Sequence, residues 1–131
     1  MVGVLLISHG QMALGMLDSI SLFIPDAPLL DALELKASDN PDDFRNVIAD
    51  KIKELDTGDG VIIFADMLGG TPANQTAYLL SDSVQVVTGM NLGMVLECLT
   101  LRQFDEVSVD HLLQVGQEGI VHLNELFRKE D

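Results

Sequence analysis

The sequence predicts an α/β fold: a single-domain, three-layer sandwich over residues 1–131, with a central, mainly parallel sheet of about four strands and helices on both faces. Three observations predict it. Apolar runs typical of buried strands alternate with segments whose apolar residues recur at helical spacing. No hairpin signal separates successive strands, and 131 residues suit one domain. Strand and helix alternating four times indicate parallel strands joined by crossover helices.

The first half of the chain predicts two strands, each followed by a helix. Residues 2–8 form a continuous apolar run, which is typical of a strand buried on both faces. Residues 29–35 predict the second strand, although Asp31 and Glu34 interrupt it. The helix between them stops at Pro25 and has these apolar residues at helical spacing: Ala13, Met16, Leu17, Ile20, Phe23 and Ile24.

Asn40 and Pro41 are a typical helix start, because asparagine accepts from a free N–H group and proline has none to lose there. The turn at 57–60 contains two glycines and ends this helix. One face of the helix is apolar: Phe44, Val47, Ile48, Ile52 and Leu55.

The second half repeats the pattern. Residues 61–66 predict a third strand, and a helix is expected over 71–81. Residues 84–88 predict the fourth strand, followed by the loop 89–93 and a helix through Leu101. A last helix is expected to carry the remaining apolar residues: Val107, Leu112, Leu113, Ile120, Leu123 and Phe127.

Charge and cysteine content exclude several classes of protein. The chain has 21 Asp and Glu against 7 Lys and Arg, a net charge of −14. Such an acidic surface repels nucleic acid and anionic lipid, and it favours a partner with a basic face. Cys98 is the only cysteine, so no internal disulfide or cysteine-rich metal site can form, and we expect a small core residue there. With no secretion signal and no apolar stretch near the roughly 20 residues of a membrane span, we expect a cytoplasmic protein.

Chemically distinctive residues follow three of the predicted strands: Ser8-His9-Gly10, residues 66–72 and residues 88–93. In open α/β sheets, ligands bind beyond the carboxyl ends of the strands. If the first and third strands are neighbours, His9 and Asp66 lie side by side. A carboxylate that accepts from one ring nitrogen leaves the lone pair of the other nitrogen free. It also stabilises the cation that forms when that nitrogen is protonated, alkylated or phosphorylated.

These loops suit a single anionic group. Glycines let the backbone come close, and the helix starts after Gly10 and Thr71 offer N–H donors. Lys and Arg are absent from all three loops, and so are a P-loop lysine and a GxGxxG turn, which excludes the usual nucleotide sites. The pattern favours one phosphoryl group that must be given away again. Met67 and Met90 suit a pocket lining or a docking surface.

Each of these residues also has a purely structural interpretation. A lone histidine at a strand end is often structural, Asp66 alone could cap a loop, and Thr71 is explained as a helix N-cap, which is compatible with a second role. His111 and His122 fall on the last predicted helix, where we expect them on the solvated surface. The convergence of His9 and Asp66 with two glycine-containing loops favours the functional interpretation.

The sequence lacks the residues that several other classes of protein require. No G-x-S-x-G elbow indicates a hydrolase, and Ser8 and His9 are sequence neighbours, which makes them a poor nucleophile–base pair. No other histidine falls in the three loops, so a metal site is not expected. A receiver domain phosphorylated on aspartate would need an acidic pair where Ser-His-Gly stands.

Three segments in order carry a resemblance to a known family. An apolar strand ends in Ser-His-Gly at 8–10, another ends in Asp-Met-Leu-Gly-Gly-Thr-Pro at 66–72, and Gly-Met-Asn-Leu-Gly-Met follows at 89–94. Over essentially its whole length the chain resembles the mannose-type IIA component of the bacterial phosphoenolpyruvate-dependent sugar phosphotransferase system (PTS).

The resemblance implies a phosphohistidine relay. His9 would accept the phosphoryl group on Nε2 from the phosphocarrier protein HPr and pass it to a histidine of a IIB component on a separate chain. Asp66 would hydrogen-bond the other ring nitrogen. Gly10, Gly70 and Thr71 would hold the phosphoryl oxygens, and no metal, nucleotide or other cofactor is implied. The membrane components IIC and IID would be reached only indirectly.

The resemblance also implies a homodimer. Exchange of a terminal strand, which occurs in some members, is not expected because no fifth strand is evident. Two alternatives stay open: the related phosphotransfer subunit of a dihydroxyacetone kinase, and a regulatory module of the kind found in transcriptional regulators. The Gly-Gly-Thr-Pro segment favours the mannose type, and the sequence does not name the sugar.

Overall fold

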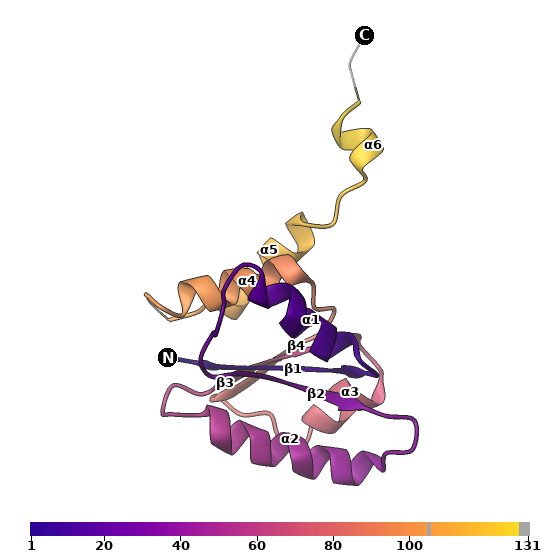
Figure 1. The fold of residues 1–131 in the computed structure, drawn as a ribbon, viewed down its shortest axis with the longest axis vertical. Helices are drawn as coiled ribbons and strands as arrows, with labels where there is room; N and C mark the ends of the chain where they lie inside the picture. Colours follow the sequence, from indigo (N-terminus) through magenta and orange to yellow (C-terminus); the bar gives the residue numbers. More distant parts are fainter. Residues whose placement is uncertain (105, 129–131) are drawn as a thin grey trace.

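The computed structural model describes residues 1–104 and 106–128. They form a four-stranded parallel sheet in the order β2-β1-β3-β4, with helices on both faces (Figure 1), which confirms the predicted α/β fold class. None of the helices in these ranges is long and apolar enough to cross a membrane. The elements are β1 (Gly3–His9), α1 (Met12–Ser21), β2 (Leu30–Leu35), α2 (Pro41–Leu55), β3 (Val61–Ala65), α3 (Thr71–Thr76), β4 (Val84–Val87), α4 (Leu92–Leu101), α5 (Val109–Glu118) and α6 (Leu123–Leu126).

The order of the strands reverses beside β1. From β1 the chain crosses to β2 on one side, and it then returns to β3 on the other side. β1 pairs with β3 in register from Gly3 opposite Val61 to Ile7 opposite Ala65. The carboxyl ends of these two strands therefore meet where ligands bind in sheets of this kind.

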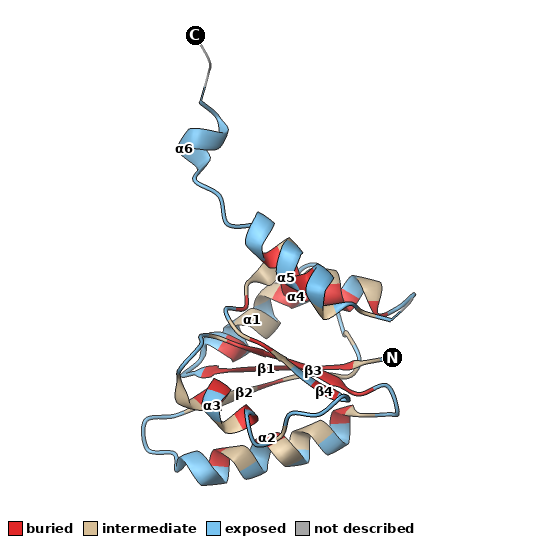
Figure 2. Ribbon diagram, turned by 180° about the vertical axis from the view of Figure 1, so that it is seen from behind, coloured by how far each residue is buried: buried red, intermediate tan, exposed pale blue. Residues whose placement is uncertain are grey.

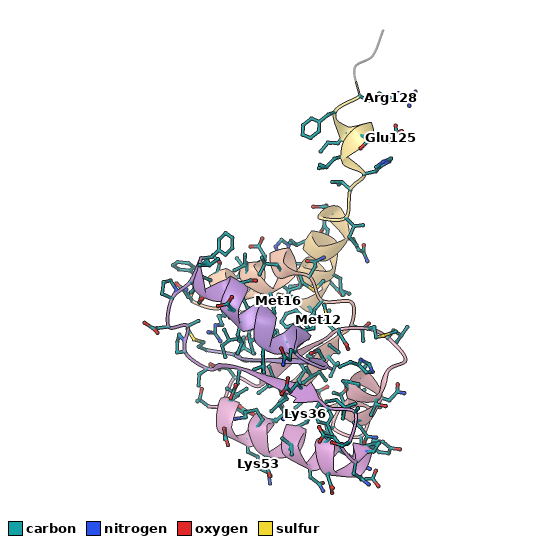
Figure 3. All side chains as sticks on the ribbon, turned by 45° about the vertical axis from the view of Figure 1, so that its right-hand side comes forward. Met12, Met16, Lys36, Lys53, Glu125 and Arg128 are labelled. Carbon is teal, nitrogen blue, oxygen red and sulfur yellow. The ribbon has the colours of Figure 1, made fainter. Side chains whose placement is uncertain are left out.

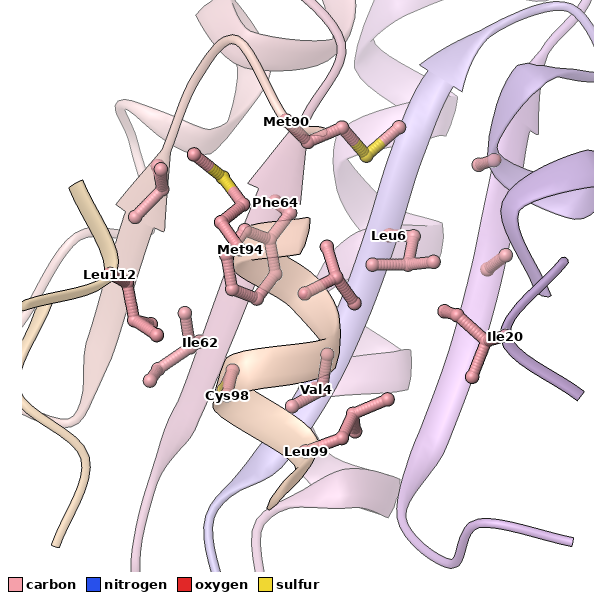
Figure 4. Close-up of a cluster of buried hydrophobic side chains, with 14 residues drawn as sticks. Val4, Leu6, Ile20, Ile62, Phe64, Met90, Met94, Cys98, Leu99 and Leu112 are labelled. Atoms are coloured by element: carbon pink, nitrogen blue, oxygen red, sulfur yellow. The ribbon is translucent and has the colours of Figure 1, made fainter. Parts of the chain in front are cut away.

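Alternate residues of β1 enter different cores, because successive side chains of a strand point to opposite faces. Val4 and Leu6 pack beneath α1, α4 and α5 (Figure 4), whereas Leu5 and Ile7 pack beneath α2 and α3. Both faces of the sheet are buried (Figure 2). Cys98 is fully buried in the first core, where burial raises the pKa of its thiol to about 12. The expected core role of Cys98 is confirmed.

The predicted start of α2 is confirmed by its capping hydrogen bonds. Pro41 is the first residue of the helix, and the Asn40 side chain accepts from the N–H groups of Asp42 and Asp43 at 2.8 and 3.2 Å. The two carboxylates lie in the first turn, where the helix dipole favours negative charge.

Two predicted helices end earlier than expected. α3 stops at Thr76 instead of reaching residue 81, because turn hydrogen bonds from Ala77 to Asn74 and from Leu79 to Thr76 replace the helical pattern. α1 stops at Ser21, so Phe23 lies in the following turn and is exposed instead of packing on the core.

The single helix predicted for the end of the chain is wrong. α5 ends at Glu118, and residues 119–128, which we call the C-terminal arm, project from the body and carry the short α6 (Figure 1). Packing sustains a helix more than apolar spacing does, so the helix breaks where its apolar residues leave the body. The arm exposes Ile120, Val121, Leu123, Leu126 and Phe127.

Two neighbouring leucines on α5 test how this helix is held. Leu112 is fully buried, whereas Leu113 is 38% exposed. Leu112→Ala is expected to lower the free energy of unfolding by about 2–5 kcal/mol, because it leaves a cavity in the core. Leu113→Ala is expected to cost less than about 1 kcal/mol. Urea denaturation followed by circular dichroism measures both, and equal losses would contradict this packing of α5.

Candidate functional site

The predicted meeting of His9 and Asp66 occurs in the structure. His9 is the last residue of β1, and Asp66 directly follows β3, its parallel neighbour. The N–H of Asp66 still donates to the carbonyl of Ile7 at 3.2 Å, which continues the pairing of the strands to the edge. The position of both side chains therefore follows from the sheet itself.

One oxygen of the Asp66 carboxylate contacts His9 twice. Oδ2 accepts from the backbone N–H of His9 at 2.9 Å and lies 2.7 Å from the ring nitrogen Nδ1. The other oxygen, Oδ1, accepts from the N–H of Met67 at 2.9 Å. An ionised carboxylate only accepts, so the contact places a proton on Nδ1, and neutral His9 presents the lone pair of Nε2.

The two partners differ in exposure. The side chain of Asp66 is 8% exposed, and that of His9 is 46% exposed. Burial by itself would raise the pKa of Asp66, but the backbone N–H of His9, its ring and the N–H of Met67 together hold it below the ordinary value of 3.8. A buried anion thus lies behind an accessible imidazole, which is the arrangement of an activated nucleophile.

The loop between β3 and α3 packs against the imidazole of His9. Gly70 lies so close that a Cβ atom there would be 2.4 Å from Cε1 of the His9 ring. Gly70 also takes the N-cap position of α3, and Thr71 is the first residue of the helix. The interpretation of Thr71 as the N-cap is therefore wrong. Thr71 is half-buried and directly follows the glycine that touches the ring, and its side chain makes no capping hydrogen bond.

The turn after β1 depends on the hydroxyl of Ser8, a structural role that was not predicted from the sequence. The buried Ser8 hydroxyl donates to the carbonyl of Gly10 at 3.1 Å and accepts from the N–H of Ala13 at 2.7 Å. Gly10 has a φ of +57°, which favours glycine. The sequence did contain a sign of this role. Ser8 is a polar residue at one of the alternate positions of β1 whose side chains face the following helix.

The third of these loops, residues 88–93 after β4, mainly holds helices in place. The Asn91 side chain caps α4 by accepting from the N–H of Met94, and its amide donates to the carbonyl of Gly116 in α5, both at 3.0 Å. Met90 is buried, and its N–H donates to the carbonyl of Ala65 at the end of β3. Of the two methionines singled out from the sequence, only Met67 is exposed and available to a partner.

The other histidines lie elsewhere. His111 is exposed on α5, 4.0 Å from Glu97, and His122 is exposed just before α6. Both have the expected surface positions, although His122 precedes a helix instead of lying within one. Among residues 1–104 and 106–128, no three His, Cys, Asp or Glu side chains form a group that could hold a metal ion.

Positive charge stays outside the three loops. Lys36, which follows β2 (Figure 3), is at the same sheet edge, but its ammonium lies 3.6 Å from the carboxylate of Glu34. Arg102 lies buried near the opposite edge and donates to the carbonyls of Val2, Pro28 and Leu29. The groups that the structure places against His9 are the backbone of Gly70 and the carboxylate of Asp66, and neither carries a positive charge.

Comparisons with known proteins show which family the sequence resembles. Residues 3–114 match the family model described as the PTS system fructose IIA component. The PTS system mannose-specific EIIAB component of Escherichia coli is 25% identical over 119 residues, which cover 86% of this chain. The same match covers 36% of that relative, so the chain spans little more than a third of the length of the curated relatives it matches.

Solved structures share the fold over nearly the whole chain. Phosphotransferase system component EIIA from Streptococcus agalactiae has a TM-score of 0.86 at 25% identity, covering 95% of this chain and 99% of that chain. The PTS IIA protein associated with the fucose utilization operon of Streptococcus pneumoniae has a TM-score of 0.85 at 26% identity, covering 96% of each chain.

The lowered pKa of Asp66 predicts a contribution to acid stability. A carboxyl whose pKa is lower in the folded state stabilises the fold above its unfolded pKa, and this stabilisation is lost as the pH falls through the folded pKa. Between neutral pH and about pH 3, wild-type protein should therefore lose more unfolding free energy than Asp66→Asn. Urea denaturation across this range measures the difference.

Asp18→Asn is the control for this experiment, because it removes the charge of an exposed aspartate on α1. This variant should keep the wild-type dependence on pH. If Asp66→Asn lost stability with acid as steeply as the wild type, the carboxylate would not be held in its ionised form by the contacts described.

Proposed function

The chain belongs to the family described as the PTS system fructose IIA component, and within it we propose that His9 is the residue that receives and passes on a phosphoryl group. The observation that carries the proposal is the 2.7 Å contact between Nδ1 of His9 and the buried carboxylate of Asp66, with the ring itself half exposed. This pair directs the Nε2 lone pair to a partner in solvent.

The transfer is a direct displacement at phosphorus. Nε2 of neutral His9 attacks the phosphoryl group carried on a histidine of HPr; the new N–P bond forms, and the old one breaks as the donor imidazole leaves with its electron pair. The proton on Nδ1 stays in place, and Asp66 stabilises the positive charge that develops on the ring. Attack by a histidine of a IIB component reverses these events and returns His9 to its neutral form.

Gly10, Gly70 and Thr71 are the groups we assign to the phosphoryl oxygens. Backbone near Gly10 and Gly70 can approach closely, and the Thr71 hydroxyl is free of a capping role. The absence of Lys and Arg from these loops suits a group that must leave again. The transfer requires no metal or nucleotide, because the phosphoryl group arrives already activated on a histidine.

The surface around His9 suits protein partners with a basic face. Met67 and Leu68 of the β3–α3 loop and Met12 at the start of α1 (Figure 3) are exposed, and they supply apolar contact area at the same sheet edge. The net charge of −14 attracts a basic partner, which can also supply the cations that the site lacks. We therefore place the protein in the cytoplasm between HPr and IIB, with IIC and IID reached only through IIB.

Phosphate incorporation tests this role. Incubation with phosphoenolpyruvate, enzyme I and HPr, each omitted in turn, should add one acid-labile phosphate to the wild type by intact mass. His9→Ala should add none, because the nucleophile is missing. Asp66→Asn should accept phosphate more slowly, by about 10²- to 10³-fold, because the developing charge loses its anionic partner. Both variants should stay folded by circular dichroism.

His111→Ala is the matched control, since it removes an exposed histidine from α5, and it should accept phosphate like the wild type. Full phosphorylation of His9→Ala would overturn the assignment. If the wild type accepted phosphate only from carriers of the dihydroxyacetone kinase pathway, or passed none to IIB, the assignment to sugar transport would be wrong.

We also propose a homodimer, and the C-terminal arm supports it. Five large apolar side chains within residues 120–127 are exposed, and an apolar surface of this kind is typical of an interface. Glu125 and Arg128 pair with one another at 3.2 Å and lie on the projecting arm, away from the sheet (Figure 3). A second copy offers the same surface, so two arms can bury each other symmetrically.

Sedimentation equilibrium tests the dimer. The wild type should have twice the 14.2 kDa mass of one chain. The double variant Leu126→Ser, Phe127→Ser should shift toward the monomer, because it removes apolar area from the arm, whereas Asn124→Ser on the same helix should not. A monomeric wild type, or a dimer unaffected by the double variant, would contradict this interface.

A further inference from the structure

The backbone of residue 70 packs directly on the imidazole of His9. A Cβ atom built on Gly70 would lie 2.4 Å from Cε1, 3.0 Å from Nε2 and 3.5 Å from Nδ1 of that ring. A separation of 2.4 Å between two carbon atoms is far inside the optimal contact of about 3.5–4.0 Å. Any side chain at position 70 would therefore occupy space that the ring now fills.

The conformation of the backbone does not explain this glycine. Gly70 has φ −87° and ψ 163°, an extended conformation open to every residue. Gly69, its neighbour, has a φ of +86° and does favour glycine. Gly70 also occupies the N-cap of α3, where serine, asparagine or aspartate would stabilise the helix more. The feature that distinguishes position 70 is its contact with His9.

The ring is consequently bounded on two sides. Asp66 holds Nδ1 by a hydrogen bond, and Gly70 limits the ring along its Cε1 and Nε2 atoms. We propose that Gly70 is a positioning residue: its missing side chain lets the imidazole rest against Asp66 with Nε2 directed to solvent. This inference rests on the proposed function of His9 as the phosphoryl acceptor.

An added methyl group should move the ring and leave the loop in place. Pro72 and Ala73 of α3 are buried, and the Asn74 amide donates to the carbonyl of Gly69 at 3.3 Å, so the backbone at position 70 is held from both sides. The His9 ring is 46% exposed and can swing outward. Such a movement separates Nδ1 from Asp66 and removes the reason for the proton to stay on Nδ1.

Gly70→Ala tests this directly, with Gly15→Ala as the matched control. A Cβ at Gly15 meets nothing within 4 Å, and this residue lies inside α1, where alanine is the better helix former. Long-range proton–nitrogen NMR of the imidazole reports which nitrogen carries the proton. His9 should hold it on Nδ1 in the wild type and in Gly15→Ala, and it should shift toward the Nε2-protonated form in Gly70→Ala. Signals of His111 and His122 should stay unchanged.

The variant in which the His9 tautomer changes should also accept the phosphoryl group more slowly. Gly70→Ala should slow acceptance from phospho-HPr by about 10- to 100-fold, the effect of a nucleophile displaced by about an ångström, while Gly15→Ala keeps the wild-type rate. An unchanged tautomer and rate in Gly70→Ala would overturn the proposal.

A double-mutant cycle tests the contact between residues 9 and 70 without measuring phosphoryl transfer. It also separates this contact from any general loss of stability that the substitution causes. Gly70→Ala should reduce the free energy of unfolding more in the wild type than in His9→Ala, because removing the ring opens the space for the methyl group. The capping effect of residue 70 is common to both backgrounds and cancels. Equal losses would show that residues 9 and 70 are not coupled and would overturn the proposal.

The two proposals fail in different ways. A wild type that takes up no phosphate from any carrier overturns the relay function of His9. The tautomer and the cycle still decide whether Gly70 positions the ring, since neither measurement involves phosphate.

Discussion

The parallel pairing of β1 with β3 is the constraint on which the site depends. His9 and Asp66 are 57 residues apart in the chain, and the register of these two strands brings them within 2.7 Å. The carboxylate contacts the backbone N–H of His9 as well as its ring, so one oxygen orients the side chain and stabilises its cationic form. A change in register would remove both contacts together.

The rest of the fold keeps this edge rigid while the ring stays accessible. β1 and β3 lie at the centre of the sheet between two apolar cores, and every residue of β3 is buried. Ser8 ties the turn after β1 to the first turn of α1, and Met90 ties the third loop to the end of β3. The imidazole is therefore an exposed group on a well-packed support, which suits the relay function that we propose for it.

Much of this arrangement could be predicted, because its elements carry strong local patterns. The apolar runs of the strands, the Asn40–Pro41 start of α2 and the core position of Cys98 are as predicted. The errors arise where packing overrides pattern. Apolar spacing continues past Gly119, yet the chain leaves the body there, and Gly70 replaces Thr71 as the cap of α3.

The sequence by itself determined the α/β class, the three loops that carry polar residues, and His9 and Asp66 as the candidate pair. It could do so because periodicity and turn residues reflect local structure. Only the tertiary structure decided that β1 and β3 are neighbours, that Asp66 is buried while His9 is exposed, and that the backbone of Gly70 touches the ring. These features are distances between residues remote in the chain. They depend on strand order and on the packing of whole layers, which no local pattern encodes.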